Sequence, residues 1–233
     1  MDSRYWVIVP AAGAARRMGG AVPKQYLPLA GRSVIEWALA PFLERPQIVA
    51  VVVVLADQDR RWPQTDLAGH AKILIAQGGA ERMNSVLAGL TALAAHAAPD
   101  DWVLVHDAAR PCLQATDLDR LIDGLRDDDV GGLLAAPVVD TLKRADDGER
   151  VAQTLPRDKL WRALTPQMFR RDLLQRALSQ SIASGATVTD EAQAVEALGL
   201  QPRLIAGDAD NIKITLPEDV LRAERILASR RTG

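Results

Sequence analysis

A loop of very small side chains followed by cations is the feature of this sequence best suited to chemistry. A short apolar run, 6–9, leads into Pro10-Ala11-Ala12-Gly13-Ala14-Ala15-Arg16-Arg17-Met18-Gly19-Gly20, and Pro23-Lys24 comes next. Small side chains let backbone N–H groups approach an anion closely, while Arg17 and Lys24 add full charges. At the end of a first strand, this pattern predicts a polyphosphate site. It is not a P-loop, and from these residues alone an alanine-rich turn without a ligand stays open.

Asp107 and Arg110 form a second charged element, at the end of an expected strand, 102–106. A carboxylate at the same sheet edge as the first loop suits Mg²⁺, which takes one or two carboxylates together with phosphate oxygens. Arg110 would then hold a second phosphate through its planar guanidinium. The alternative is an Asp107–Arg110 salt bridge that caps a loop. We interpret His106 as structural, because the sequence suggests no catalytic partner for it.

Four further residues carry groups that a ligand would meet at a turn or in an apolar run. Gly79 and Ser85 belong to a glycine turn that either admits a base or ribose or simply starts a helix. Thr189 is typical of a helix N-cap, although hydroxyls at a helix N-terminus also bind phosphate. Lys213 lies in an apolar run, so its ammonium needs an anion or a carboxylate nearby.

The composition describes a globular protein of a reducing compartment. The 233 residues are 48% hydrophobic, and the net charge of −2 argues against a nucleic-acid binder that relies on bulk charge. The single cysteine, Cys112, excludes an intramolecular disulfide, and the three histidines show no zinc spacing. The longest apolar run, 48–56, is too short to span a bilayer. We therefore expect a cytoplasmic protein with no nucleic-acid or membrane partner.

Short apolar runs alternate with helical patterns along the chain. Several runs are continuously apolar, as strands buried on both faces are. This alternation predicts an α/β, Rossmann-like domain over 1–233, with a mostly parallel sheet of about seven strands and helices on both faces. The expected strands are Trp6–Val9, Ile48–Leu55, Ile73–Ala76, Trp102–His106, Gly132–Pro137, Pro202–Ala206 and Ile212–Thr215. The expected helices are Ser33–Leu43, Glu81–His96, Asp117–Leu125, Arg170–Ser184, Asp190–Leu198 and Pro217–Ser229.

One segment, 140–155, interrupts this alternation. It has little apolar content, and Asp146-Asp147-Gly148 at its centre is typical of a hairpin turn between strands Thr141–Ala145 and Arg150–Leu155. An isolated hairpin is marginally stable in water, so it needs a surface to lie on, either its own domain or a partner subunit. A flexible surface excursion is the alternative. The first interpretation makes the segment at about 138–158 a protruding β-hairpin arm.

Taken together, these motifs resemble the 2-C-methyl-D-erythritol 4-phosphate cytidylyltransferase family, in order and over nearly the whole chain. Ala15 stands where the family usually has a glycine, and Ala80 where it commonly has an acidic residue. No cyclase domain follows Gly233, so the monofunctional form is expected. The matching segments are Pro10–Gly13, Arg17-Met18, Pro23–Tyr26, Ser85–Leu90, Val105–Pro111, Ala136-Pro137, Asp140-Thr141, Leu164–Gln167, Thr189–Ala192 and Asp210–Lys213.

The resemblance implies that the phosphate of methylerythritol phosphate attacks the α-phosphorus of CTP and that pyrophosphate leaves, with Mg²⁺ as cofactor. A phosphate nucleophile is largely ionised at neutral pH, so no general base is required. That agrees with a sequence that suggests no Ser/His or Cys/His pair. Orientation and charge neutralisation remain for the protein to supply. The resemblance also implies a homodimer, in which the arm crosses to the partner subunit.

By the same resemblance, Arg17 and Lys24 stabilise the transition state, and Arg157 and Lys213 position the methylerythritol phosphate. Asp107 helps to hold the metal. The residues expected around the nucleotide are Ala11, Ala12, Gly13, Ala14, Gly79, Ala80, Ser85 and Asp107. Those expected around the second substrate are Arg110, Thr141, Arg157, Thr165, Thr189 and Lys213.

Two other functions fit parts of the same pattern. A cytidylyltransferase for another polyol phosphate, such as ribitol 5-phosphate, would share the first loop and the Asp107–Arg110 element. A regulatory nucleotide-binding module would share the loop, but simple binding has no need for Arg17, Lys24, Asp107 and Lys213 together. Release of pyrophosphate from CTP with each polyol phosphate separates the three.

Overall fold

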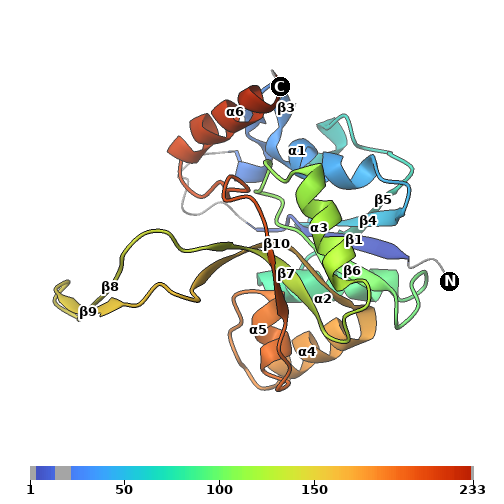
Figure 1. Ribbon diagram of the computed structural model, residues 1–233. Coiled ribbons are helices and arrows are strands. Elements are labelled where there is room, and N and C mark those ends of the chain that lie inside the picture. Colours follow the sequence, from blue (N-terminus) through green and yellow to red (C-terminus); the bar gives the residue numbers. More distant parts are fainter. Residues whose placement is uncertain (1–3, 14–21, 232–233) are drawn as a thin grey trace.

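A seven-stranded sheet forms the centre of the molecule (Figure 1). The structure is a computed structural model that describes residues 4–13 and 22–231. The strand order is β11-β7-β10-β6-β1-β4-β5, and β10 alone runs antiparallel to its neighbours. The α/β, mostly parallel sheet predicted from the sequence is therefore confirmed. Its strands are β1 (Tyr5–Pro10), β4 (Ile48–Leu55), β5 (Ile73–Gln77), β6 (Trp102–Val105), β7 (Gly131–Pro137), β10 (Trp161–Arg170) and β11 (Arg203–Ala206).

Helices cover both faces of the sheet, because its central strands are apolar on both sides. In β1, Val7 and Val9 face α1 and α3, whereas Trp6 and Ile8 face α2, α4 and α5. Both sets are buried, as the continuous apolar run predicts. The six expected helices all form. Their bounds are α1 (Val34–Leu43), α2 (Arg82–Leu93), α3 (Ala115–Leu125), α4 (Arg171–Ala183), α5 (Glu191–Glu196) and α6 (Glu218–Arg231). None of these described helices is long and apolar enough to cross a membrane.

A smaller apolar cluster lies away from the sheet, between α6 and a short ribbon. The ribbon is formed by β2 (Pro28–Leu29) and β3 (Arg32–Ser33), and 3₁₀ turns lie nearby at Lys24–Tyr26 and Trp62–Gln64. The expected strand Ile212–Thr215 is wrong: this segment joins no sheet. Ile212 and Ile214 are buried in the α6 cluster instead, and the N–H of Ile214 bonds to the carbonyl of Ala109 at 2.8 Å.

Strand β10 was not expected from the sequence, although it is central to the sheet. Pro166 lies in its middle, and proline is normally confined to edge strands or bulges. Here the pairing with β7 shifts between Ala163 and Gln167, which accommodates the proline. Beyond it, Gln167 pairs with Val105 of β6. The strand therefore carries Thr165 to the carboxyl end of β6.

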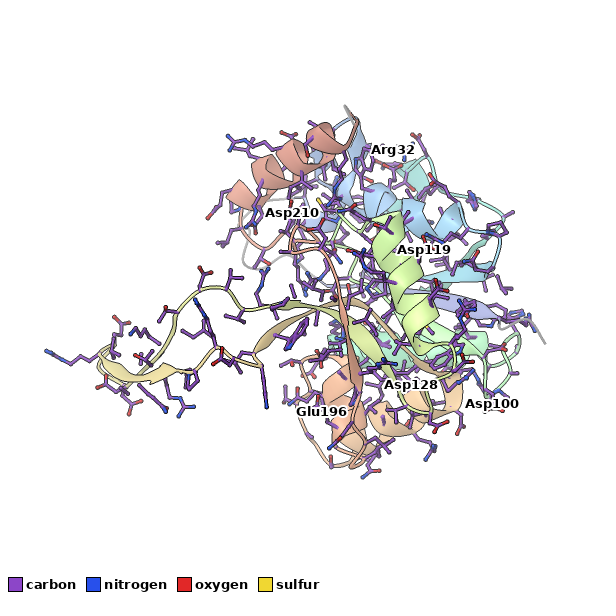
Figure 2. All side chains as sticks on the ribbon, in the orientation of Figure 1. Arg32, Asp100, Asp119, Asp128, Glu196 and Asp210 are labelled. Atoms are coloured by element: carbon purple, nitrogen blue, oxygen red, sulfur yellow. The ribbon has the colours of Figure 1, made fainter. Side chains whose placement is uncertain are left out.

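The segment that interrupts the alternation forms a hairpin that projects far from the sheet (Figure 1). Its strands are β8 (Leu142–Ala145) and β9 (Val151–Leu155), each starting one residue later than expected. The Asp146 carboxylate accepts the N–H groups of Gly148 at 3.0 Å and Arg150 at 2.9 Å, which fixes the turn. Figure 2 shows its side chains extending into open space on both sides. The predicted arm is therefore present in the fold.

Candidate active site

A cavity of about 490 Å³ opens at the carboxyl ends of the parallel strands. Three loops that follow β1, β5 and β6 meet there, as expected where an open α/β sheet binds ligands. Two other segments contribute lysines to the cavity: Lys24 lies on the 3₁₀ turn Lys24–Tyr26, and Lys213 lies shortly before α6. The lining residues are Pro10, Ala11, Ala12, Gly13, Lys24, Gln25, Gly79, Ala80, Glu81, Arg82, Ser85, Asp107, Ala108, Ala109 and Lys213.

The first loop is held against its neighbours by two hydrogen bonds of Ala11. Its N–H donates to the carbonyl of Val54 at 2.8 Å, and its carbonyl accepts the buried amide of Gln25 at 2.7 Å. Gly13 has open space where a side chain would project. The predicted nucleotide-binding residues Ala11, Ala12 and Gly13 all line the cavity, whereas Ala14 and Arg17 lie outside the described residues.

The loop after β5 leaves no room for side chains at its two glycines, one packed against the first loop and the other against the start of α2. A Cβ atom on Gly78 would lie 2.3 Å from the Cβ atom of Ala12, and one on Gly79 would lie 2.5 Å from that of Asn84. The hydroxyl of Ser85 accepts the N–H of Gly79 at 3.3 Å and donates to the carbonyl of Glu81 at 3.2 Å. Ser85 thus shapes the turn that presents Gly79 and Ala80 to the cavity.

Asp107 lies at the end of β6 and gathers three cations. Its Oδ1 atom meets Arg82 Nε at 3.1 Å, and its Oδ2 atom meets Lys213 Nζ at 2.9 Å and Arg110 Nε at 3.3 Å. Burial alone would raise the pKa of Asp107, but these charges hold it well below its usual range. The Asp107–Arg110 salt bridge considered from the sequence exists, as one part of a larger cluster.

His106 and Thr165 fix the loop that carries Asp107 through buried hydrogen bonds. The Thr165 hydroxyl accepts the N–H of Asp107 at 3.2 Å, so its own hydrogen is available to His106 Nδ1 at 2.9 Å. The other ring nitrogen, Nε2, then donates to the carbonyl of Arg110 at 3.1 Å. Burial lowers the pKa of His106 to about 4, so the ring is neutral at pH 7. This arrangement fits the structural role inferred for His106.

The segment 211–214 joins the site through backbone carbonyls. Arg110 donates to the carbonyl of Asn211 at 2.7 Å, and Lys24 donates to that of Ile214 at 3.1 Å. The Asn211 side chain donates to the carbonyl of Thr165 at 2.7 Å. These bonds, rather than a sheet ladder, fix the backbone that carries Lys213.

Of the six residues expected around the second substrate, Lys213 alone is in the cavity lining, and three are exposed elsewhere. Thr141 and Arg157 are exposed at the base of the arm, where Arg157 donates to the carbonyl of Val139. Thr189 is exposed before α5, and its N–H and hydroxyl both donate to Gln193 Oε1, at 2.7 and 3.0 Å. Of the other members of that set, Thr165 is buried beneath the Asp107 loop, and Arg110 and Lys213 contact Asp107.

Sequence reasoning missed Arg82 and Glu191, which form a buried ion pair beside Asp107. Arg82 Nη1 lies 2.6 Å from Glu191 Oε1, although the residues are 109 positions apart. The only signal in the sequence was their position at helix starts. Arg82 follows the glycine turn, and Glu191 lies in the segment Thr189–Ala192 that resembles the family. Neither charge could be assigned a partner from spacing.

Comparisons with known proteins agree with this geometry. A profile of the 2-C-methyl-D-erythritol 4-phosphate cytidylyltransferase family matches residues 5–229. A relative of that name from Pseudomonas aeruginosa (strain UCBPP-PA14) is 53% identical over 222 residues, which is 95% of each chain. One from Azoarcus sp. (strain BH72) is 53% identical over 99% of this chain and 96% of its own.

The chain belongs to the 2-C-methyl-D-erythritol 4-phosphate cytidylyltransferase family. Solved structures support the assignment. A crystal structure named 4-diphosphocytidyl-2C-methyl-D-erythritol synthase has a TM-score of 0.84 and 37% identity, and covers 97% of this chain and 99% of its own. The Francisella tularensis cytidylyltransferase has a TM-score of 0.83 and 34% identity, with 96% and 100% covered. The resemblance drawn from the motifs is therefore confirmed.

Proposed function

We propose that this protein transfers CMP from CTP to 2-C-methyl-D-erythritol 4-phosphate and releases pyrophosphate, in the supply of isoprenoid precursors. A phosphate oxygen of the second substrate forms a bond to the α-phosphorus of CTP. The bond from that phosphorus to the oxygen shared with the β-phosphorus breaks, and this oxygen leaves with pyrophosphate. The observation that carries the proposal is the cation cluster at Asp107, which lies in a cavity bounded by two loops of small residues. The family to which the chain belongs supports the same reaction. The cluster supports phosphoryl chemistry that requires orientation and charge neutralisation, without a general base.

The nucleotide is proposed to lie along the two loops. Backbone N–H groups at Ala12, Gly13, Gly79 and Ala80 would face its phosphates and ribose, because the side chains of these four lining residues are no larger than a methyl group. Lys24 lines the same cavity and would meet charge that develops on the α-phosphate, with Arg17 expected to act beside it.

Asp107 is proposed to hold Mg²⁺ together with phosphate oxygens of CTP. The described residues contain no group of three or more His, Cys, Asp or Glu side chains placed to hold a metal. One carboxylate fits Mg²⁺, because this ion is commonly bound through one or two carboxylates plus substrate phosphates and water. When bound, the ion would neutralise phosphate charge. The cations already around Asp107 disfavour a metal ion alone, so we expect it to enter with CTP.

The second substrate is proposed to lie between Lys213 and the base of an arm. Lys213 lines the cavity and Arg110 contacts Asp107, whereas Arg157, Thr141 and Thr189 are exposed residues outside the lining. We propose a single nucleotidyltransferase domain that forms a homodimer through the arm, so that the Arg157 of a partner subunit completes the site. The small net charge and single cysteine support a cytoplasmic enzyme of small molecules, without nucleic-acid or membrane partners.

The experiment is a pyrophosphate-release assay with CTP and Mg²⁺, in parallel with methylerythritol phosphate, ribitol 5-phosphate or no acceptor. Release only with methylerythritol phosphate supports the proposal. Faster release with ribitol 5-phosphate would make the protein a cytidylyltransferase for that polyol. No release with either acceptor, despite CTP binding, would support the regulatory module.

A further inference from the structure

Arg82 is shared between two carboxylates on opposite sides of its guanidinium. Its terminal nitrogens Nη1 and Nη2 bind Glu191 Oε1 and Oε2 at 2.6 and 3.1 Å. Its Nε atom binds Asp107 Oδ1 at 3.1 Å. This is the bidentate geometry that a planar guanidinium provides and that an ammonium cannot. Arg82 therefore links the start of α5 to the Asp107 carboxylate in the cavity lining.

Glu191 is a buried charge whose side chain is only 1% exposed. Within residues 4–13 and 22–231, the hydrogen bonds of its carboxylate go to Arg82 alone. A buried carboxylate without a countercharge is very costly, so Glu191 restrains Arg82 strongly. Burial would lower the pKa of Arg82, but Glu191 and Asp107 raise it, so the guanidinium stays charged.

The two carboxylate oxygens of Asp107 consequently differ in how firmly their partners are held. Oδ1 is bound by Arg82, which Glu191 anchors from the far side. Oδ2 is bound by Arg110, itself tied to the carbonyl of Asn211, and by Lys213. The Lys213 side chain is 39% exposed, and among the described residues its ammonium pairs with Asp107 only. Lys213 is thus the one cation of the three that is not anchored a second time.

We propose that Arg82 and Glu191 are a positioning pair for the transfer reaction. They fix Asp107 through Oδ1, so that Oδ2, still held by Arg110, faces the ligand when Lys213 moves to a phosphate. They also join this carboxylate to the segment that carries Thr189. The inference rests on the proposed function, because it assigns the pair a role in that reaction.

The test separates positioning from simple stabilisation with three variants, Arg82→Gln, Glu191→Gln and the double variant. Either single change leaves one buried charge without its partner, so we expect a lower Tm. The double change leaves no uncompensated charge in the pair, so most of the lost Tm should return. The value of kcat/KM should stay about 10- to 100-fold low in all three, because outer partners of a metal-binding side chain have effects of this size.

Glu196→Gln is the matched control. Glu196, labelled in Figure 2, is exposed at the end of the same helix α5. We expect its kcat/KM and Tm to stay close to those of the wild type. Calorimetry of CTP binding with Mg²⁺, without the second substrate, supplies a readout that needs no turnover. There the double variant should bind at least about tenfold more weakly than the wild type.

A double variant that regained both Tm and kcat/KM, or that bound CTP with Mg²⁺ as the wild type does, would overturn the inference and leave the pair purely structural. Failure of the proposed function is distinguishable. In that case the wild type itself would not turn over CTP with methylerythritol phosphate, whatever the variants do.

Discussion

Asp107 shows how single side chains set the charge of the site. Three cations, from Arg82, Arg110 and Lys213, surround it, and Glu191 is the second carboxylate of the cluster. The cluster therefore keeps an excess of positive charge in a partly enclosed cavity, which also contains Lys24. A concave, positively charged site attracts and holds a polyphosphate. We therefore expect local charge, rather than the net charge of −2, to hold the proposed substrates.

At this scale we predict that Lys24→Ala lowers kcat by about 10²–10³ and changes KM for CTP far less, because the ammonium would meet charge that develops in the transition state. Tm should change little, since Lys24 lies on a short 3₁₀ turn at the cavity. Steady-state kinetics beside thermal melting measures both. Arg176→Ala, an exposed cation on α4, is the control. A near-normal kcat with a raised KM would make Lys24 a binding residue only.

The sequence predicted part of the site at residue level. The small loop, Lys24, Gly79, Ala80, Ser85, Asp107 and Lys213 all line the cavity, because the ends of parallel strands bring their loops together. The pairing of Arg82 with Glu191 could not be predicted, because it depends on how α5 packs beside α2. The roles assigned to these residues remain predictions, and Arg17 lies outside the described residues.

At the scale of elements, helix α1 begins with a capping box that also anchors a distant loop. Glu36 Oε2 accepts the N–H and the hydroxyl of Ser33, each at 2.6 Å, and Oε1 accepts the N–H of Asp66 at 2.8 Å. Burial alone would raise the pKa of Glu36, but these hydrogen bonds lower it overall. The ionised carboxylate therefore stabilises the folded state.

We predict that Glu36→Ala lowers the free energy of unfolding by about 1–2 kcal/mol at pH 7. Since the folded state lowers this pKa, the stabilisation is present above the ordinary carboxyl pKa and is lost as pH falls through the folded value. The difference between wild type and variant should shrink below about pH 4. Urea denaturation at several pH values measures it, with exposed Glu44→Ala as control. A difference that is constant down to pH 3 would contradict this account.

Element predictions succeeded where one pattern dominated and failed where packing decided. Short apolar runs, several of them continuous, predicted six strands of the central sheet, and helical patterns predicted all six helices. The apolar spacing of Ile212 and Ile214 is typical of a strand, but α6 rather than a sheet buries them. Strand β10 contains Pro166, which local rules place at an edge. Its central position depends on an irregular pairing with β7 that no local pattern specifies.

At the scale of the whole molecule, the arm projects far from the sheet and its covering helices (Figure 1). Val139 and Val151 are 75% and 64% exposed, and Trp161 at the base of the arm is 37% exposed. Exposed apolar residues on a marginal hairpin support the proposed dimer, because a partner surface would cover them.

We predict that the protein sediments as a homodimer and that Arg157 acts across its interface. Arg157→Ala and Lys213→Ala should each be nearly inactive alone. Mixed in equal amounts and allowed to exchange subunits, they should regain about a quarter of wild-type activity, because half the dimers are mixed and one of their two sites is intact. Each variant mixed with itself is the control. No regain despite exchange, or a fully active monomer, would show that Arg157 does not act this way.

The central claim is that this cavity joins CMP to methylerythritol phosphate, and a ³¹P NMR time course with CTP, methylerythritol phosphate and Mg²⁺ tests it most directly. Wild type and Asp107→Asn are followed side by side. We predict equal amounts of pyrophosphate and a new diphosphodiester, without free CMP, and at least a roughly 100-fold slower reaction in the variant. Pyrophosphate accompanied by free CMP, or an unchanged rate in Asp107→Asn, would contradict the account.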